Sequence, residues 1–261
     1  MRGPAGTIRP VATAVRDGAR IEYEVTGDGP PLVLLHGFFG DRTTWHAAGH
    51  TGALADQFRL VLVDLAGHGG SDAPSDPARY LMAEHARDVV AVLDHAGIGR
   101  AAVWGASMGG RVGFHLMARF PGRLAALIAG GAHACAVETG LAEAQREGKV
   151  LREQGTAPFA DAIEPEWMRR VALRADGHAL ALQLLADAGE TSPLSDLALV
   201  TTPVLLLAGE LDPRLELIRA TGDRLRRAEL AVLPGCGHFD TFTRTDLTIP
   251  LAREFLGRPR P

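Results

Sequence analysis

The stretch that most constrains the fold is a Gly-x-Ser-x-Gly pentapeptide at residues 105–109. A short apolar run precedes it, and an amphipathic segment follows it with apolar side chains at helical spacing: Val112, Leu116 and Phe120. This order predicts a strand, a sharp turn and a helix. Gly105 and Gly109 allow strand and helix to pass close together, while Ser107 at the turn takes a strained backbone conformation that exposes its hydroxyl.

The rest of the chain alternates between strand-like and helix-like segments. Two alternating segments, 11–15 and 20–25, flank Asp17-Gly18 and predict a hairpin. Continuous apolar runs predict buried strands at 32–35, 58–63, 101–104, 124–128, 204–207 and 230–233. Because helix-like segments separate these runs, we expect an α/β fold with a mostly parallel, eight-stranded sheet covered by helices on both faces.

Residues 134–198 interrupt this alternation. They lack strand-like runs and contain two helix-like segments, 141–154 and 166–188. We therefore expect a small helical cap at 134–198, inserted into a core formed by residues 1–133 and 199–261. Trp167 belongs to a roughly helical apolar pattern in this segment. That pattern fits a wall of an apolar pocket, and it fits equally well the packing of cap helices on the core.

Three residues that could perform acyl transfer follow predicted parallel strands. Ser107, Asp212 and His238 each lie in a turn just past the carboxyl end of a strand. Parallel strands bring those ends to one edge of the sheet, where ligands bind. A serine hydroxyl needs an imidazole to take its proton, and the imidazole needs a carboxylate to orient it. We therefore predict that Ser107 is the nucleophile, His238 the base and Asp212 the orienting acid.

A glycine-containing loop, His36-Gly37-Phe38-Phe39-Gly40, follows the strand at 32–35. Its backbone N–H groups can face a cleft at the same edge of the sheet. We expect substrate contacts from this loop, from the helix after Ser107, from the cap and from the turn after His238. The residues assigned to these contacts are His36, Gly37, Phe39, Trp45, Arg111, Trp167 and Phe239.

With these motifs, the chain resembles the α/β-hydrolase superfamily over nearly its whole length. The resemblance covers a nucleophile elbow at 105–109, an oxyanion loop at 36–38, an acid turn at 209–212 and a histidine loop at 235–238. It implies that the amides of Phe38 and Met108 form the oxyanion hole. Serine rather than aspartate occupies position 107, which excludes the epoxide hydrolase and haloalkane dehalogenase branches and favours the esterase-like branch.

The leading hypothesis is a serine hydrolase that cleaves a carboxylic ester, lactone or thioester through an acyl-enzyme. A second resemblance, on residues 36–41, Trp45 and 107–111, is to the menaquinone-pathway synthase that eliminates pyruvate. It implies a lyase or C–C bond hydrolase in which Arg111 helps to hold an anionic substrate. Ala106 departs from that family, which usually has tyrosine there, and a scaffold role for Arg111 is the other interpretation. A ligand-binding protein without turnover is the third possibility.

Composition and charge narrow the range of possible binding partners. A net charge of −4 and a pI near 6.2 give no indication of nucleic-acid binding. No His, Cys and carboxylate cluster has metal-ligand spacing, and no G-x-G-x-x-G opens a helix, so we expect neither metal nor organic cofactor. Residues 1–10 lack the apolar core of a secretion signal, and no apolar run has membrane-spanning length. We expect a cytoplasmic protein, without membrane contact, that acts on a small acyl substrate; a homodimer is left open.

Overall fold

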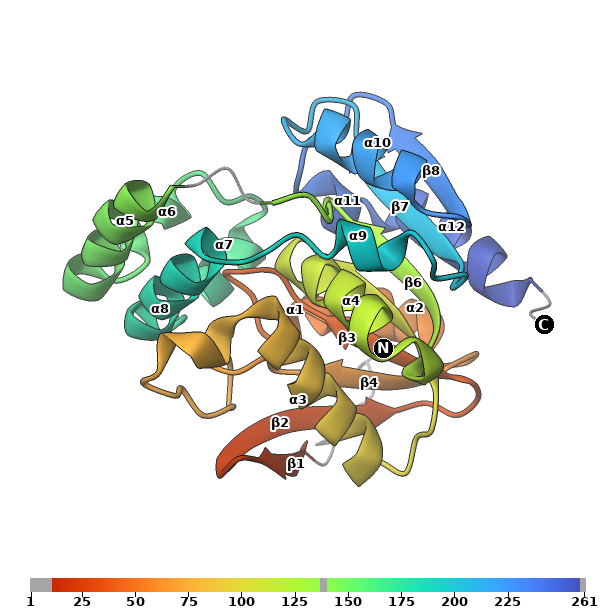
Figure 1. The fold of residues 1–261 in the computed structure, drawn as a ribbon, viewed down its shortest axis with the longest axis horizontal. Helices are drawn as coiled ribbons and strands as arrows, with labels where there is room; N and C mark the ends of the chain where they lie inside the picture. The colour runs from red at the N-terminus through yellow and green to blue at the C-terminus, as the bar shows by residue number, and fades with distance from the viewer. Residues whose placement is uncertain (1–10, 137–139, 259–261) are drawn as a thin grey trace, which may run out of the picture.

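The computed structural model describes residues 11–136 and 140–258, which form one eight-stranded sheet with helices on both sides (Figure 1). The strand order is β1-β2-β4-β3-β5-β6-β7-β8. The strands are β1 Val11–Arg16, β2 Ala19–Thr26, β3 Pro31–Leu35, β4 Arg59–Val63, β5 Ala101–Ala106, β6 Leu124–Gly130, β7 Val204–Gly209 and β8 Ala228–Leu233. Strands β1 and β2 pair antiparallel and β2 joins β4 antiparallel, whereas all other pairs are parallel. The predicted fold class is confirmed.

Two layers of helices cover the sheet, and each layer has its own apolar core. Val33 and Leu35 of β3 pack with the first layer, whereas Leu32 and Leu34 pack with the second. This split follows from the alternation of side chains along a strand. The first layer contains α3 Met82–His95, α4 Met108–Arg119 and α10 Leu215–Arg224, with the short helices η1 Pro77–Tyr80 and η2 Pro121–Arg123 beside it; the second contains α1 Thr43–Ala47, α2 His50–Leu54, α11 Asp240–Thr243 and α12 Thr245–Gly257.

In the described part of the chain, five helices connect β6 to β7. They are α5 Leu141–Gln154, α6 Ala157–Ala160, α7 Glu166–Ala172, α8 Gly177–Ala188 and α9 Leu194–Leu197. Helices α5 to α8 form a group at one end of the sheet (Figure 1). Leu151 of α5 and Leu180 of α8 pack there against Phe38 and Phe39. Helix α9 lies apart from this group, because Leu197 belongs to the core beside α4.

One helix boundary differs from the prediction. Residues 166–188 form two helices, α7 and α8, rather than one. The side chain of Asp176 accepts hydrogen bonds from the backbone N–H groups of His178 and Ala179, at 2.8 and 3.2 Å. An aspartate at this position satisfies N–H groups that have no partner inside a helix, and so starts a new one.

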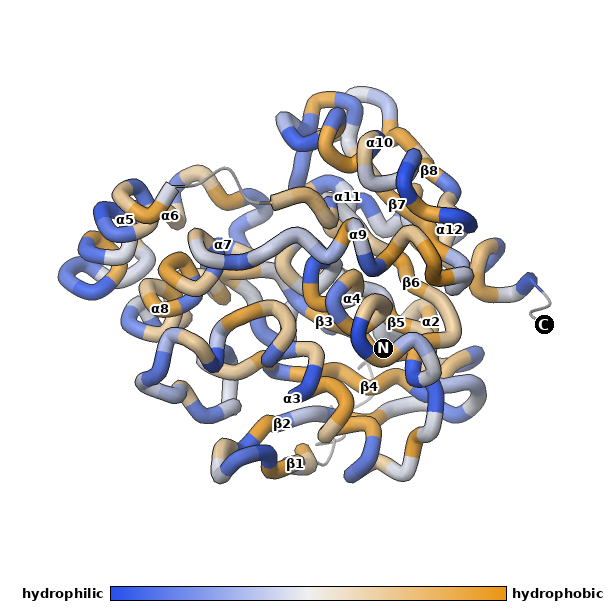
Figure 2. The backbone as a smooth tube through the Cα atoms, viewed as in Figure 1, coloured by the Kyte–Doolittle hydropathy of each residue, from blue (hydrophilic) through white to orange (hydrophobic). Residues whose placement is uncertain are grey.

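Hydropathy follows this layout. Hydrophobic colouring runs along the strands in the middle of the molecule, whereas α5 is mainly hydrophilic (Figure 2). No helix in the described part of the chain is both long enough and apolar enough to cross a lipid bilayer.

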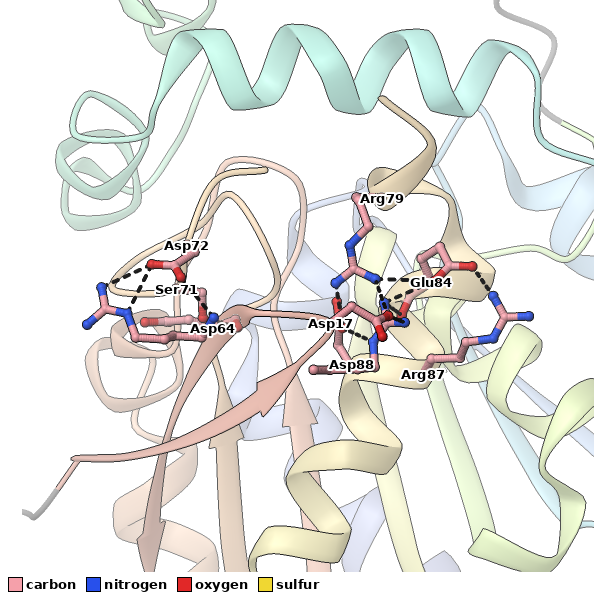
Figure 3. Close-up of polar contacts among 10 residues, drawn as sticks. Asp17, Asp64, Ser71, Asp72, Arg79, Glu84, Arg87 and Asp88 are labelled. Atoms are coloured by element: carbon pink, nitrogen blue, oxygen red, sulfur yellow. Dashed lines mark hydrogen bonds and ion pairs between the residues drawn. The ribbon is translucent and has the colours of Figure 1, made fainter. Parts of the chain in front are cut away.

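An ion-pair cluster fixes α3 to the hairpin. Arg16 at the end of β1 and Arg79 of η1 both donate to one oxygen of Asp88, at 2.5 and 3.2 Å, and both contact Asp17 (Figure 3). Burial raises the pKa of Asp88 to about 6, although the hydrogen bond and charge of Arg16 act in the opposite direction. The cluster thereby holds η1 and α3 against the edge of the sheet.

The second core contains a histidine that has no polar partner. The ring of His50 stacks on Phe242 and lies edge-on to Trp45 and Trp104, with ring centroids 4.8–4.9 Å apart. Neither ring nitrogen has a hydrogen-bond partner among the described residues. Burial lowers the pKa of His50 to about 3, from an ordinary value of 6.5.

We predict that His50→Phe increases stability, by a margin that grows as the pH falls. The unfolded chain protonates His50 near pH 6.5, whereas the folded chain keeps it neutral to about pH 3. In this window the wild-type protein therefore loses about 1.4 kcal/mol more unfolding free energy per pH unit than the variant does. Urea unfolding at pH 7, 6 and 5 measures this difference. A difference between the two proteins that stays constant over these pH values would contradict the prediction.

Candidate active site

The site begins at the turn between β5 and α4. Ser107 lies there with φ of 50°, in the left-handed region that non-glycine residues rarely occupy. A Cβ on Gly105 would lie 2.3 Å from the backbone of Gly109, and a Cβ on Gly109 would lie 2.3 Å from the carbonyl oxygen of Leu35. Only glycines allow this approach, so the elbow expected from the sequence is present in the backbone.

The three residues predicted to act together lie in hydrogen-bond contact. Nε2 of His238 is 3.0 Å from Oγ of Ser107, and Nδ1 of His238 is 2.8 Å from Oδ2 of Asp212. Because a carboxylate only accepts, Nδ1 carries the proton and Nε2 is free to accept from the serine hydroxyl. The adjacent strands β5, β6, β7 and β8 bring the three turns to one edge of the sheet.

The environment of Asp212 keeps it ionised. Its side chain is fully buried, and Oδ1 accepts from the backbone N–H of Arg214 at 2.9 Å. Burial alone raises the pKa of Asp212, but the hydrogen bonds from His238 and Arg214, with the charges of both residues, bring that pKa below its ordinary value. An ionised carboxylate at this position fixes the tautomer and the orientation of the imidazole.

The glycine loop after β3 lies directly against the nucleophile. A Cβ on Gly37 would lie 3.6 Å from Cβ of Ser107. The amides of Phe38 and Met108, assigned to the oxyanion hole by resemblance, donate no hydrogen bond to any described residue. Met108 is the first residue of α4, where backbone N–H groups lack partners within the helix. Both amides are thus free to bind a ligand oxygen beside Ser107.

A cavity of about 470 Å³ opens over Ser107 and His238. Its apolar wall comes from the loop after β3, from helices α4 to α8 and from the turn after β8: Phe38, Phe39, Met108, Leu151, Phe159, Ile163, Met168, Leu184, Phe239 and Phe242. Its polar wall consists of Thr44, Arg111, His133, Glu147, Asp187, Arg214 and Thr241. An apolar pocket with a few polar groups is typical of small-molecule sites.

Four of the residues expected to contact substrate line this cavity: Gly37, Phe39, Arg111 and Phe239. The other three do not. His36 is fully buried, and its Nε2 accepts from the amide of Leu65 at 3.1 Å. Trp45 is fully buried beside Trp104, and Trp167 packs on Phe242; neither tryptophan is among the described residues that line the cavity. These three residues support the lining instead of forming it, which corrects the expectation.

The polar wall contains residues that sequence reasoning missed. Asp187 near the end of α8 forms an ion pair with Arg111 at 3.1 Å. His133 follows β6, and Arg214 follows Asp212 by two residues. Proximity to the acid turn could have indicated Arg214. No sequence signal joins Asp187 to Arg111, because the two residues are far apart in the chain and meet only in the folded structure.

The comparisons with known proteins agree with this fold. Residues 30–173 match the model of the alpha/beta hydrolase fold family, and this match covers more than half of the chain. The chain therefore belongs to the α/β-hydrolase fold family.

Three similar proteins illustrate the range of the family. The chain is 30% identical to a pimeloyl-acyl-carrier-protein methyl ester esterase of Nitrosomonas europaea, over 84% of this chain and 93% of that protein. It is 25% identical to a Bacillus subtilis protein provisionally named 2-succinyl-6-hydroxy-2,4-cyclohexadiene-1-carboxylate synthase, over 94% and 98%. The solved structure of a Thermogutta terrifontis esterase has a TM-score of 0.85 and 26% identity, over 95% and 98%. The esterases among these similar proteins support the interpretation of this chain as a hydrolase.

We predict that Gly131→Ala disables the site without unfolding the protein. Gly131 has φ of 60°, and a Cβ there would lie 2.9 Å from two ring atoms of His238, forcing the imidazole away from Ser107. Gly97→Ala, at the turn that ends α3, is the matched control, since φ is 67° and nothing lies within 4 Å. Both variants carry the cost of a positive φ.

The rate at which a fluorophosphonate labels Ser107 is the measurement for this pair of variants. We expect Gly131→Ala to slow labelling at least about tenfold relative to Gly97→Ala, with similar melting temperatures for both. Equal labelling rates would show that His238 does not depend on the space beside Gly131.

Proposed function

We propose that the protein is a serine hydrolase that cleaves a carboxylic ester, lactone or thioester through an acyl-enzyme. The observation that carries the proposal is the unbroken contact from Ser107 through His238 to the buried Asp212, at 3.0 and 2.8 Å, on the floor of a largely apolar cavity. A nucleophile held against a base, with the base held against an ionised acid, is the arrangement that acyl transfer requires. In this proposal, residues 134–198 act as the cap over the cavity.

The first half of the reaction forms the acyl-enzyme. Oγ of Ser107 attacks the carbonyl carbon while Nε2 of His238 takes the hydroxyl proton, and Asp212 stabilises the resulting imidazolium. The carbonyl oxygen becomes an oxyanion held by the amides of Phe38 and Met108. One donor of this kind is worth about 2.7–4 kcal/mol of transition-state stabilisation. The bond to the leaving alcohol or thiol then breaks, and His238 gives that group its proton.

The second half releases the acid. A water molecule takes the place of the leaving group, and His238 accepts one of its protons as the oxygen attacks the acyl carbon. The bond to Oγ breaks, Ser107 recovers its proton from His238, and a carboxylic acid leaves. In a lactone, the leaving alcohol is part of the acyl group, so a single hydroxy acid is released.

A lyase or C–C bond hydrolase is the second candidate, favoured by the likeness to the Bacillus subtilis protein provisionally named as a synthase. Two observations in this chain favour the serine hydrolase that cleaves esters, lactones or thioesters over this second candidate. Arg111, which that resemblance assigns to an anionic substrate, is already paired with Asp187. Trp45, the other residue behind the resemblance, is fully buried away from the cavity.

We predict that Ser107→Ala lowers kcat for p-nitrophenyl butyrate at least about a thousandfold, because the nucleophile is removed. The matched control is Ser75→Ala, which changes an exposed serine outside the cavity. A fluorophosphonate should label the wild-type protein and the control at Ser107, and leave Ser107→Ala unlabelled. Equal ester hydrolysis by wild type and Ser107→Ala would refute the mechanism. A wild-type protein that neither hydrolyses esters nor takes the label would favour the ligand-binding alternative.

A further inference from the structure

The polar wall of the cavity contains an ion pair between α4, the helix that follows the turn at Ser107, and α8. Arg111 lies in the first turn of α4, four residues after Ser107, and Asp187 lies near the end of α8. Nη1 of Arg111 is 3.1 Å from Oδ2 of Asp187, and the two side chains are only 16% and 13% exposed. Both line the cavity, so their combined charge is what a bound substrate meets there.

Asp187 is held in place from behind. Its Oδ1 accepts from Nε2 of Gln183 at 3.1 Å, and the same Nε2 donates to the carbonyl oxygen of Tyr80 at 2.8 Å. Oε1 of Gln183 accepts from Nε2 of His85 at 2.7 Å. Burial lowers the pKa of His85 to about 4, which leaves it neutral with a fixed donor role in this contact. The carboxylate therefore cannot turn away from Arg111 without breaking a buried network.

A second carboxylate lies close to the same guanidinium. Glu190 and Arg111 share a small cavity of about 10 Å³ behind the main one, and Oε2 of Glu190 accepts from the amide of Met82 at 2.7 Å. Burial raises the pKa of Glu190, whereas the hydrogen bond from Met82 and the charge of Arg111 act to lower it. Arg111 is thus one cation close to two acidic side chains, and its positive charge is not available to the cavity as a net charge.

The remaining ionisable groups of the polar wall also offset one another. Glu147 of α5 and Arg214 near the start of α10 have opposite charges. The guanidinium of Arg214 is 3.9 Å from Oδ1 of Asp212. His133 is neutral at pH 7, because burial, with the charges of Arg111 and Arg214, lowers its pKa to about 4. A carboxylate on the substrate would have to enter a largely apolar space with no uncompensated cation at Arg111, and that transfer is costly.

We propose that Asp187 determines which substrate charge the cavity accepts. By cancelling the positive charge of Arg111, it makes the cavity select uncharged acyl groups over acyl groups that carry a carboxylate. This proposal rests on the proposed hydrolase function and specifies its substrate class. A pocket can reject an unwanted ligand by placing a like charge in its path. Asp187 is in that position for an anion approaching Arg111, while the aliphatic and aromatic wall accepts an uncharged chain of similar shape.

The test compares two p-nitrophenyl esters of nearly equal shape, the uncharged 6-methylheptanoate and the half-ester of adipic acid, at pH 7.5. We expect wild type to favour the uncharged ester at least about tenfold in kcat/KM. Asp187→Asn keeps the size of the side chain and one acceptor oxygen, which can still receive the hydrogen bond from Gln183, but it removes the charge. We expect it to lower this ratio about tenfold, mainly through the adipate half-ester.

Two controls accompany this variant. Asp187→Glu keeps the charge and should keep the wild-type preference. Glu143→Gln makes the same change of charge on the exposed first turn of α5, outside the cavity lining, and should leave the ratio unchanged.

The outcomes separate this inference from the function beneath it. Hydrolysis of neither ester by wild type would overturn the proposed function and the inference together. Efficient hydrolysis with a preference for the carboxylated ester, or an unchanged ratio in folded Asp187→Asn, would overturn the inference alone. The wild-type comparison does not depend on a variant, so it decides the matter even where Asp187→Asn fails to fold.

Discussion

The close approach of α4 to strands β3 and β5 is the constraint on which the rest of the site depends. It is possible only because Gly105 and Gly109 have no side chains where backbone meets backbone. The approach forces Ser107 into a positive φ and lifts its hydroxyl toward His238, and the amide of Met108 has no partner among the described residues. Part of the folding free energy is therefore stored as backbone strain at one residue, as is common at functional sites.

The sequence was sufficient to predict the features that depend on local order. Continuous apolar runs separated by helix-like segments predicted the sheet. Glycine-flanked turns after three strands predicted which side chains meet at its edge. Positions that depend on how separate layers pack were not predictable in this way. Trp45 and Trp167 were expected to contact substrate, yet both pack on Phe242 of α11, and of these three side chains only Phe242 lines the cavity. The break between α7 and α8 depends on Asp176, a single capping residue inside an otherwise continuous apolar pattern.

The charge of the cavity wall was likewise not predictable from the sequence. A sequence motif marks Arg111 as a residue near substrate, but only the fold shows that Asp187 is within 3.1 Å of it. This contact changes the interpretation of Arg111, from a side chain that binds an anionic substrate to one partner of an ion pair. The pair also has a structural role, because it connects the elbow helix to α8 and, through Gln183, to the segment before α3. The proposed specificity and the position of α8 thus depend on the same contact.

The central claim is that Ser107 forms a covalent acyl intermediate, assisted by His238. Mass spectrometry of the protein, quenched during turnover of a p-nitrophenyl ester, tests this claim most directly. The account predicts that the peptide containing Ser107 gains the mass of the acyl group, and that this adduct disappears as substrate is exhausted. Turnover without any adduct on Ser107, or with the acyl group on another residue, would contradict it.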